Sequence, residues 1–77
     1  MTPTSLKLFL EFAADAGNWG GTPMIGGNVA GSKELRGNIT QLKRAGLIKT
    51  FASDGGSFVS FTDAGKELAA SHGLSLD

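Results

Sequence analysis

The chain of 77 residues has no cysteine, a single histidine and no excess of charge of either sign. The absence of cysteine excludes disulfide bonds and thiolate metal sites, and it suits a cytoplasmic protein. No apolar run approaches the roughly 20 residues of a membrane-spanning helix. Residues 1–17 also lack the basic start and uninterrupted apolar run of a secretory signal. We therefore expect one small domain at residues 1–77, located in the cytoplasm and without a membrane partner.

The charges are balanced overall but are separated along the sequence. Seven basic and seven acidic residues give a formal charge of zero. The segment 33–49 contains five basic residues and one acidic residue, which leaves it at +4 and the remainder of the chain at −4. This clustering of cations favours a nucleic-acid surface over an ordinary solvated helix face, although exposed lysines and arginines are common.

Periodic apolar residues predict a first helix at about 5–16, with Thr4 and Ser5 as candidate N-caps after Pro3. The segment 17–31 follows and is rich in glycine, so it cannot form a long helix. Within it we expect two short elements, an edge strand and one helical turn, at 22–25 and 28–31.

The second half of the chain shows clearer boundaries. A helix at about 32–45 begins at a capping serine and ends at Gly46, which suits a left-handed C-cap. Two β-prone runs separated by Asp-Gly predict a hairpin at about 47–61. Thr62 is the expected N-cap of a last helix at about 63–71, after which the tail is expected to fray.

The residues "GNITQLKRAGLI", a hairpin and then "VSFTDAGKELA" resemble a winged helix-turn-helix domain of the MarR-like and related bacterial and archaeal regulators. In that family a recognition helix ends in a Gly-Leu-Ile-like turn, and Thr-x-x-Gly-x-x-Leu opens the helix after the wing. The resemblance implies an α+β fold with three main helices, a short turn-like helix and a two- to three-stranded β-hairpin wing. It also implies sequence-specific binding of double-stranded DNA by a small transcriptional regulator. The glycine-broken segment before residue 33 departs from the fuller second helix of the family.

The helix at 32–45 has one apolar side and one cationic side. At 100° per residue, Leu35, Ile39 and Leu42 define the buried side. Cationic, amide and hydroxyl side chains occupy the opposite side and the flanks, and such groups contact phosphates and base edges in the major groove. With Lys49 at the base of the wing, the predicted DNA-binding residues are Lys33, Arg36, Gly37, Asn38, Thr40, Gln41, Lys43, Arg44 and Lys49.

Gly37 is unusual because a glycine inside a helix costs about 0.5–1 kcal/mol relative to alanine. One interpretation is that it lets the helix backbone approach DNA closely. A second is that it is a tolerated surface glycine in a glycine-rich chain. A third places it in the first turn of a helix that starts nearer Arg36.

Other patterns define what else we expect. Asp54 at the wing tip would repel phosphate, so the wing should contribute little to DNA binding. No nucleophile–base pair or metal-ligand cluster is visible, and Glu11 and Asp15 are interpreted as a solvated acidic pair, so we expect no enzyme activity, cofactor or metal.

A homodimer through the first or last helix would read two half-sites. The alternative is a protein-interaction module that uses the wing or an exposed patch of Trp19, Met24 and Ile25 in the glycine-rich loop.

Overall fold

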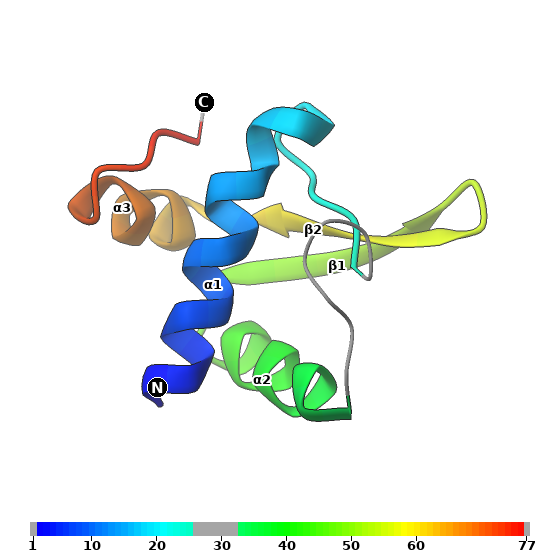
Figure 1. The fold of residues 1–77 in the computed structure, drawn as a ribbon, viewed down its shortest axis with the longest axis horizontal. Coiled ribbons are helices and arrows are strands. Elements are labelled where there is room, and N and C mark those ends of the chain that lie inside the picture. Colours follow the sequence, from blue (N-terminus) through cyan, green and yellow to red (C-terminus); the bar gives the residue numbers. More distant parts are fainter. Residues whose placement is uncertain (1, 26–32, 77) are drawn as a thin grey trace.

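Three α-helices and an antiparallel hairpin make up the computed structural model, which describes residues 2–25 and 33–76 (Figure 1). The elements are α1 (Pro3–Asp15), the 3-10 helix η1 (Ala16–Trp19), α2 (Lys33–Arg44), β1 (Ile48–Ser53), β2 (Gly56–Phe61) and α3 (Asp63–Ser71). The expected α+β class is confirmed, and the arrangement is compatible with a winged-helix-like fold. The turn-like helix expected at 28–31 lies outside the described residues.

Helix α1 begins earlier than the sequence suggested. Its N-cap is Thr2, whose hydroxyl oxygen accepts a hydrogen bond from the Ser5 amide at 3.1 Å, with Pro3 in the first helical position. Proline suits that position because its φ is already helical and its missing N–H has no partner to lose. Prediction of Thr4 or Ser5 as the cap was therefore wrong, and Ser5 is instead a buried residue of the helix interior.

The hydrophobic core lies where α1 crosses the hairpin and packs against α2 (Figure 1). Phe9 and Phe12 of α1 are fully buried, and the ring of Phe9 meets that of Phe61 edge to face at 5.7 Å. The fully buried Leu42 comes from α2 and Val59 from β2. Because the predicted apolar side of α2 supplies Ile39 and Leu42, its opposite side is left for solvent.

Gly46 ends α2 as expected. Its φ is +75°, its amide donates to the Lys43 carbonyl, and the next amide, of Leu47, donates to the Leu42 carbonyl at 3.1 Å. This pair of bonds is the Schellman motif, which needs a left-handed residue at the glycine position. The motif reverses the chain within two residues, and β1 then begins at Ile48.

The hairpin closes through the two-residue turn that Asp-Gly predicted. Ser53 pairs with Gly56, and the two residues between them, Asp54 and Gly55, have φ values of 51° and 81°. Positive φ at both central residues is the type I′ arrangement that matches strand twist. At the expected edge strand 22–25, Met24 forms a bridge with Phe58 on the free side of β2, and the Ile25 amide donates to the Ser57 carbonyl at 2.8 Å.

Helix α3 is tied to the turn after α2 by Thr62. The Thr62 hydroxyl caps the helix by accepting from the Gly65 amide at 3.1 Å, and it donates to the Gly46 carbonyl at 2.5 Å. The Thr62 amide donates to the Leu47 carbonyl at 3.1 Å. A Cβ on the buried Gly65 would stand 2.1 Å from that same carbonyl oxygen, so only glycine fits here. The Thr-x-x-Gly spacing thus has a direct packing cause.

The tail after α3 does not fray as expected. Gly73 has φ +81° and its amide donates to the Ala70 carbonyl, while the Leu74 amide donates to the Ala69 carbonyl. These bonds form a second Schellman motif. They turn the chain back so that Leu74 and Leu76 pack, partly buried, against the core.

Candidate nucleic-acid interface

Helix α2 presents most of the predicted DNA-binding residues to solvent. Exposed side chains on the described part of α2 are those of Arg36, Thr40, Gln41, Lys43 and Arg44, together with the Gly37 backbone. Asn38 is half-buried, and Lys49 is exposed on β1. Lys33 begins the helix, but its side chain lies outside the described residues, as does that of Leu35.

Gly37 lies well inside α2, because the helix begins four residues earlier at Lys33. The interpretation that placed Gly37 in a first turn near Arg36 is therefore wrong. Its α-carbon faces open space, with nothing within 4 Å of a Cβ built there. Neither packing nor a positive φ requires glycine at this position, so close approach to a partner and simple tolerance remain the two interpretations.

One edge of α2 is bonded to α1 by polar side chains. The Ser5 hydroxyl oxygen lies 2.9 Å from Asn38 Oδ1 and 2.7 Å from Gln41 Oε1. A hydroxyl has one proton, so Ser5 donates to one amide oxygen at a time, and its oxygen accepts from the Thr2 hydroxyl at 3.1 Å. Asn38 and Gln41 therefore fasten α2 to α1, a role that the angular analysis of a single helix did not predict.

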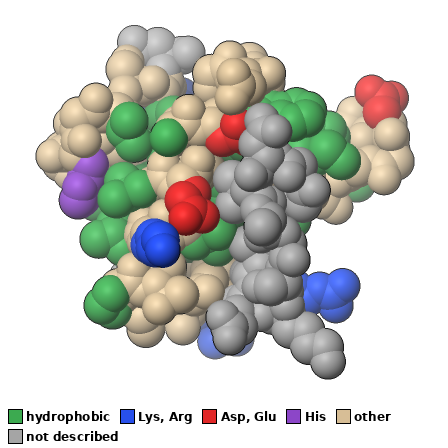
Figure 2. Space-filling model, in the orientation of Figure 1, with side chains coloured by type: hydrophobic (Ala, Val, Ile, Leu, Met, Phe, Trp, Pro, Cys, Tyr) green, Lys and Arg blue, Asp and Glu red, His purple; other side chains and the backbone are tan. Residues whose placement is uncertain are grey.

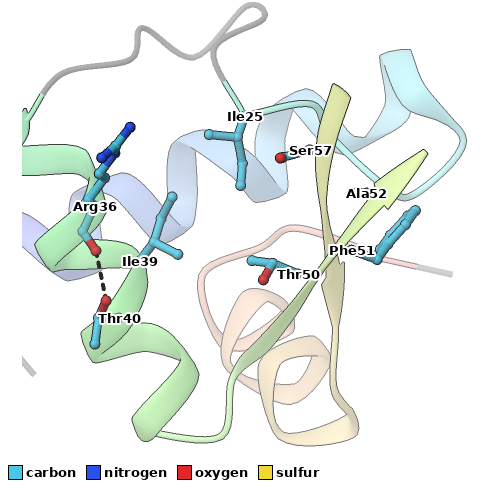
Figure 3. Close-up of a pocket in the computed structure, with 8 residues that line it drawn as sticks. All are labelled: Ile25, Arg36, Ile39, Thr40, Thr50, Phe51, Ala52 and Ser57. Carbon is cyan, nitrogen blue, oxygen red and sulfur yellow. Dashed lines mark hydrogen bonds between the residues drawn. The ribbon is translucent and has the colours of Figure 1, made fainter. Parts of the chain in front are cut away.

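The other edge of α2 faces the hairpin across a groove (Figure 3). Arg36 and Thr40 of α2 stand opposite residues 50–52 of β1 and Ser57 of β2. Thr40 Oγ1 donates to the Arg36 carbonyl oxygen at 2.9 Å, so its proton is used within the helix. The groove places a cation and hydroxyl groups between the helix and the wing.

Between these two edges lies a carboxylate-free cationic surface. At 100° per residue, Lys43, Arg36, Thr40, Arg44 and Gly37 span an arc of about 120°. Within residues 36–44 there is no acidic residue, and none of the three cations forms an ion pair in the described part of the chain. We call Arg36, Lys43 and Arg44 the cationic band. Lys43 and Arg44 also lie in the last turn, where positive charge complements the helix dipole.

The glycine-rich loop is anchored by its tryptophan. Trp19 Nε1 donates to Asp15 Oδ2 at 2.8 Å, and its ring meets that of Phe58 edge to face at 6.3 Å. Asn18 Nδ2 donates to Asp15 Oδ1, also at 2.8 Å. Asp15 is only 8% exposed, so the expectation that it forms a solvated acidic pair with Glu11 was wrong. The carboxylate instead organises η1 through its two described donors.

The expected patch of Trp19, Met24 and Ile25 is neither exposed nor fully buried. All three side chains are half-buried, and they pack against the hairpin edge or the core. The exposed large hydrophobic residue of the described chain is Phe51, at 42%, stacked on Phe58 with ring centroids 5.6 Å apart. Strand alternation from the buried Ile48 places Phe51 on the outer face, a signal that was present in the sequence but was not used.

The comparisons with known proteins add no relative. The sequence matches no family model, and neither a curated protein nor a solved structure shows significant similarity to it. In the stretches 2–25 and 33–76, every helix is too short or too polar to cross a bilayer. Across the same stretches, no three acidic or histidine side chains converge as metal ligands.

Proposed function

We propose that the protein is a winged-helix regulator of transcription that binds double-stranded DNA in the cytoplasm, with α2 in the major groove. The observation that carries the proposal is the cationic band. Helix α2 is held by its apolar side and by the Ser5 contact, and over residues 36–44 its remaining surface carries three cations and no acidic residue. A helix fixed on two sides presents these charges at constant positions, as groove binding requires.

The residues divide into positioning and contact roles. In the proposal Arg36 and Arg44 contact phosphates or the O6 and N7 atoms of guanine, while Lys43 and Lys49 contact phosphates. Lys33 would add a further cation at the N-terminus of α2. The structure weakens the case for Asn38 and Gln41 as base readers, because base contact by either amide competes with its bond to Ser5.

The wing has a smaller part in this proposal. Asp54 is exposed at the turn of the hairpin, where it would repel a phosphate group. Lys49 lies near the start of β1, five positions away from that carboxylate along the strand and turn. In the proposal, the hairpin therefore contacts DNA only near Lys49 and along the groove between α2 and the hairpin, and its turn does not contact DNA.

A paired-variant titration tests the proposal. We expect Arg36→Ala/Arg44→Ala to weaken binding to a mixed-sequence duplex and to reduce the slope of log K against log salt by about 2, because each lost phosphate contact removes about 0.9. Lys66→Ala is the control, since it removes an exposed cation from α3, outside α2 and outside the exposed face of α1. An equal change in slope per removed cation in the two variants would contradict the assignment to α2.

A protein-interaction module is the second candidate function, and Phe51 is the observation that favours it. A ring that is 42% exposed beside an acidic turn is more typical of a protein contact than of a phosphate contact. The unmodified chain distinguishes the two functions in the same titration. DNA binding through α2 predicts duplex binding that weakens as salt rises, whereas a protein-interaction module predicts no duplex binding.

A further inference from the structure

An apolar groove runs along the side of α1 that faces away from α2. It is lined by Pro3, Leu6, Leu10 and Ala14 of α1 and by Leu74 after α3, with Lys7 and Glu11 on its rim. Figure 2 shows hydrophobic side chains over α1 with a cationic and an acidic side chain beside them. This surface has no part in the proposed DNA contact.

The groove is built by the fold and is not a frayed end. Leu74 forms one wall, and the Schellman motif at Gly73 fixes its backbone through the bond to the Ala69 carbonyl at 2.9 Å. On α1, Leu6 and Leu10 are half-buried and line the groove, and Leu10 also packs against the core. Leu10 lies about 140° around the helix from Ser5, which bonds α2.

The opposite charges of Lys7 and Glu11 on the rim of the groove indicate which partner would bind there. Lys7 and Glu11 are exposed, lie one helical turn apart, and form no ion pair within residues 2–25 and 33–76. Their midpoint is residue 9, and the apolar lining from Pro3 to Ala14 is centred between residues 8 and 9. A two-fold axis near this point would bring each lysine of one copy beside the glutamate of the other.

We propose that the groove binds the same groove of a second copy of this chain, with the two α1 helices antiparallel. In a parallel pair, the two-fold axis would place the charged rims of the two copies on opposite sides of the interface, so no lysine would meet a glutamate. The antiparallel pair satisfies both charges and joins two apolar stripes, as a self-complementary two-fold interface does. Since α2 packs on a different side of α1, both cationic bands stay free.

The dimer should be weak. Helix α1 has 13 residues, so it is about 20 Å long. Two such helices bury well under the roughly 1,200 Å² of a standard stable interface. We therefore expect a dissociation constant on the order of 10–100 µM. The proposal does not depend on DNA binding, because the dimer forms without DNA and is measured in its absence.

A charge swap tests the proposal by sedimentation velocity from about 10 µM to about 1 mM protein. We expect Lys7→Glu and Glu11→Lys each to weaken dimerisation by about tenfold, because each turns two attractive contacts into repulsive ones. The double variant Lys7→Glu/Glu11→Lys restores the pairing with signs reversed and should recover the dissociation constant of the unmodified chain. Glu67→Lys, on the exposed side of α3, is the control and should leave it unchanged.

These variants change only exposed side chains, and circular dichroism checks that each one folds. An unmodified chain that remains monomeric at about 1 mM would overturn the proposal. A double variant that dimerises no better than the two single variants would overturn the antiparallel arrangement. If the unmodified chain dimerises but does not bind duplex DNA, the result would count against the proposed function and not against the dimer.

Discussion

Two glycines, both in helices, should respond to the same substitution in opposite directions. Gly65 and Gly37 each gain about 0.5–1 kcal/mol from the lower backbone entropy of the unfolded state when replaced by alanine. At Gly37 nothing lies within 4 Å of the added methyl group, so this gain is the whole effect. At Gly65 the methyl carbon would stand 2.1 Å from the Leu47 carbonyl oxygen, and backbone must move.

The movement required at Gly65 can be estimated from that distance. An ordinary contact needs about 3.5 Å, so the first turn of α3 and residue 47 must separate by more than about 1 Å. The Leu47 carbonyl accepts from the Thr62 amide at 3.1 Å, and the Thr62 side chain bonds Gly46, so separation strains both contacts. We expect a net loss of about 1–3 kcal/mol, the usual cost of overpacking.

Urea denaturation followed by circular dichroism measures both variants. A domain of this size has a free energy of unfolding of about 4–12 kcal/mol, so the expected difference of about 1.5–4 kcal/mol between Gly37→Ala and Gly65→Ala is easily resolved. In thermal unfolding, each kcal/mol moves the midpoint by about 4–8 °C. A Gly65→Ala variant at least as stable as the unmodified chain would refute the packing at Leu47.

Three further outcomes follow from the polar contacts and from Gly37. Ser5→Ala should lower the free energy of unfolding by about 1–3 kcal/mol, because two amides of α2 lose their shared partner; no change in urea midpoint would count against that contact. Asp15→Ala should cost a similar amount and shift the fluorescence of Trp19, the sole tryptophan, towards that of solvated indole; an unchanged spectrum would argue against the indole–carboxylate bond. Gly37→Ala should weaken duplex binding if α2 approaches DNA closely, and equal affinity in a titration would favour the tolerated surface glycine.

Local signals predicted the second half of the chain well. Gly46 stops α2 through a left-handed residue, Asp54 and Gly55 close the hairpin, and Thr62 caps α3. Each of these features depends on the backbone preference or side-chain reach of residues within a few positions. Such signals can be read from one short stretch of sequence, which explains why the elements after residue 33 match their expected positions.

Contacts between distant segments were not predictable in the same way. Ser5 meets Asn38 and Gln41 across 33 and 36 positions, and only the packing of α1 on α2 brings them together. Viewed on one helix, Gln41 is an outward amide available to DNA. Asp15 looked solvated for a similar reason, because its partner Trp19 was assigned to a loose loop. The set of DNA-contact residues predicted on α2 therefore included two amides that bond α1 instead.

The most direct test of the account is the salt dependence of duplex binding by the unmodified chain. The exposed cations Arg36, Lys43, Arg44 and Lys49 correspond to about three or four phosphate contacts. Log affinity should then fall with log salt with a slope of about −3 to −4, and Arg36→Ala/Arg44→Ala should reduce that slope by about 2. Absence of duplex binding at low salt, or a slope that the double variant leaves unchanged, would contradict the assignment of DNA binding to α2.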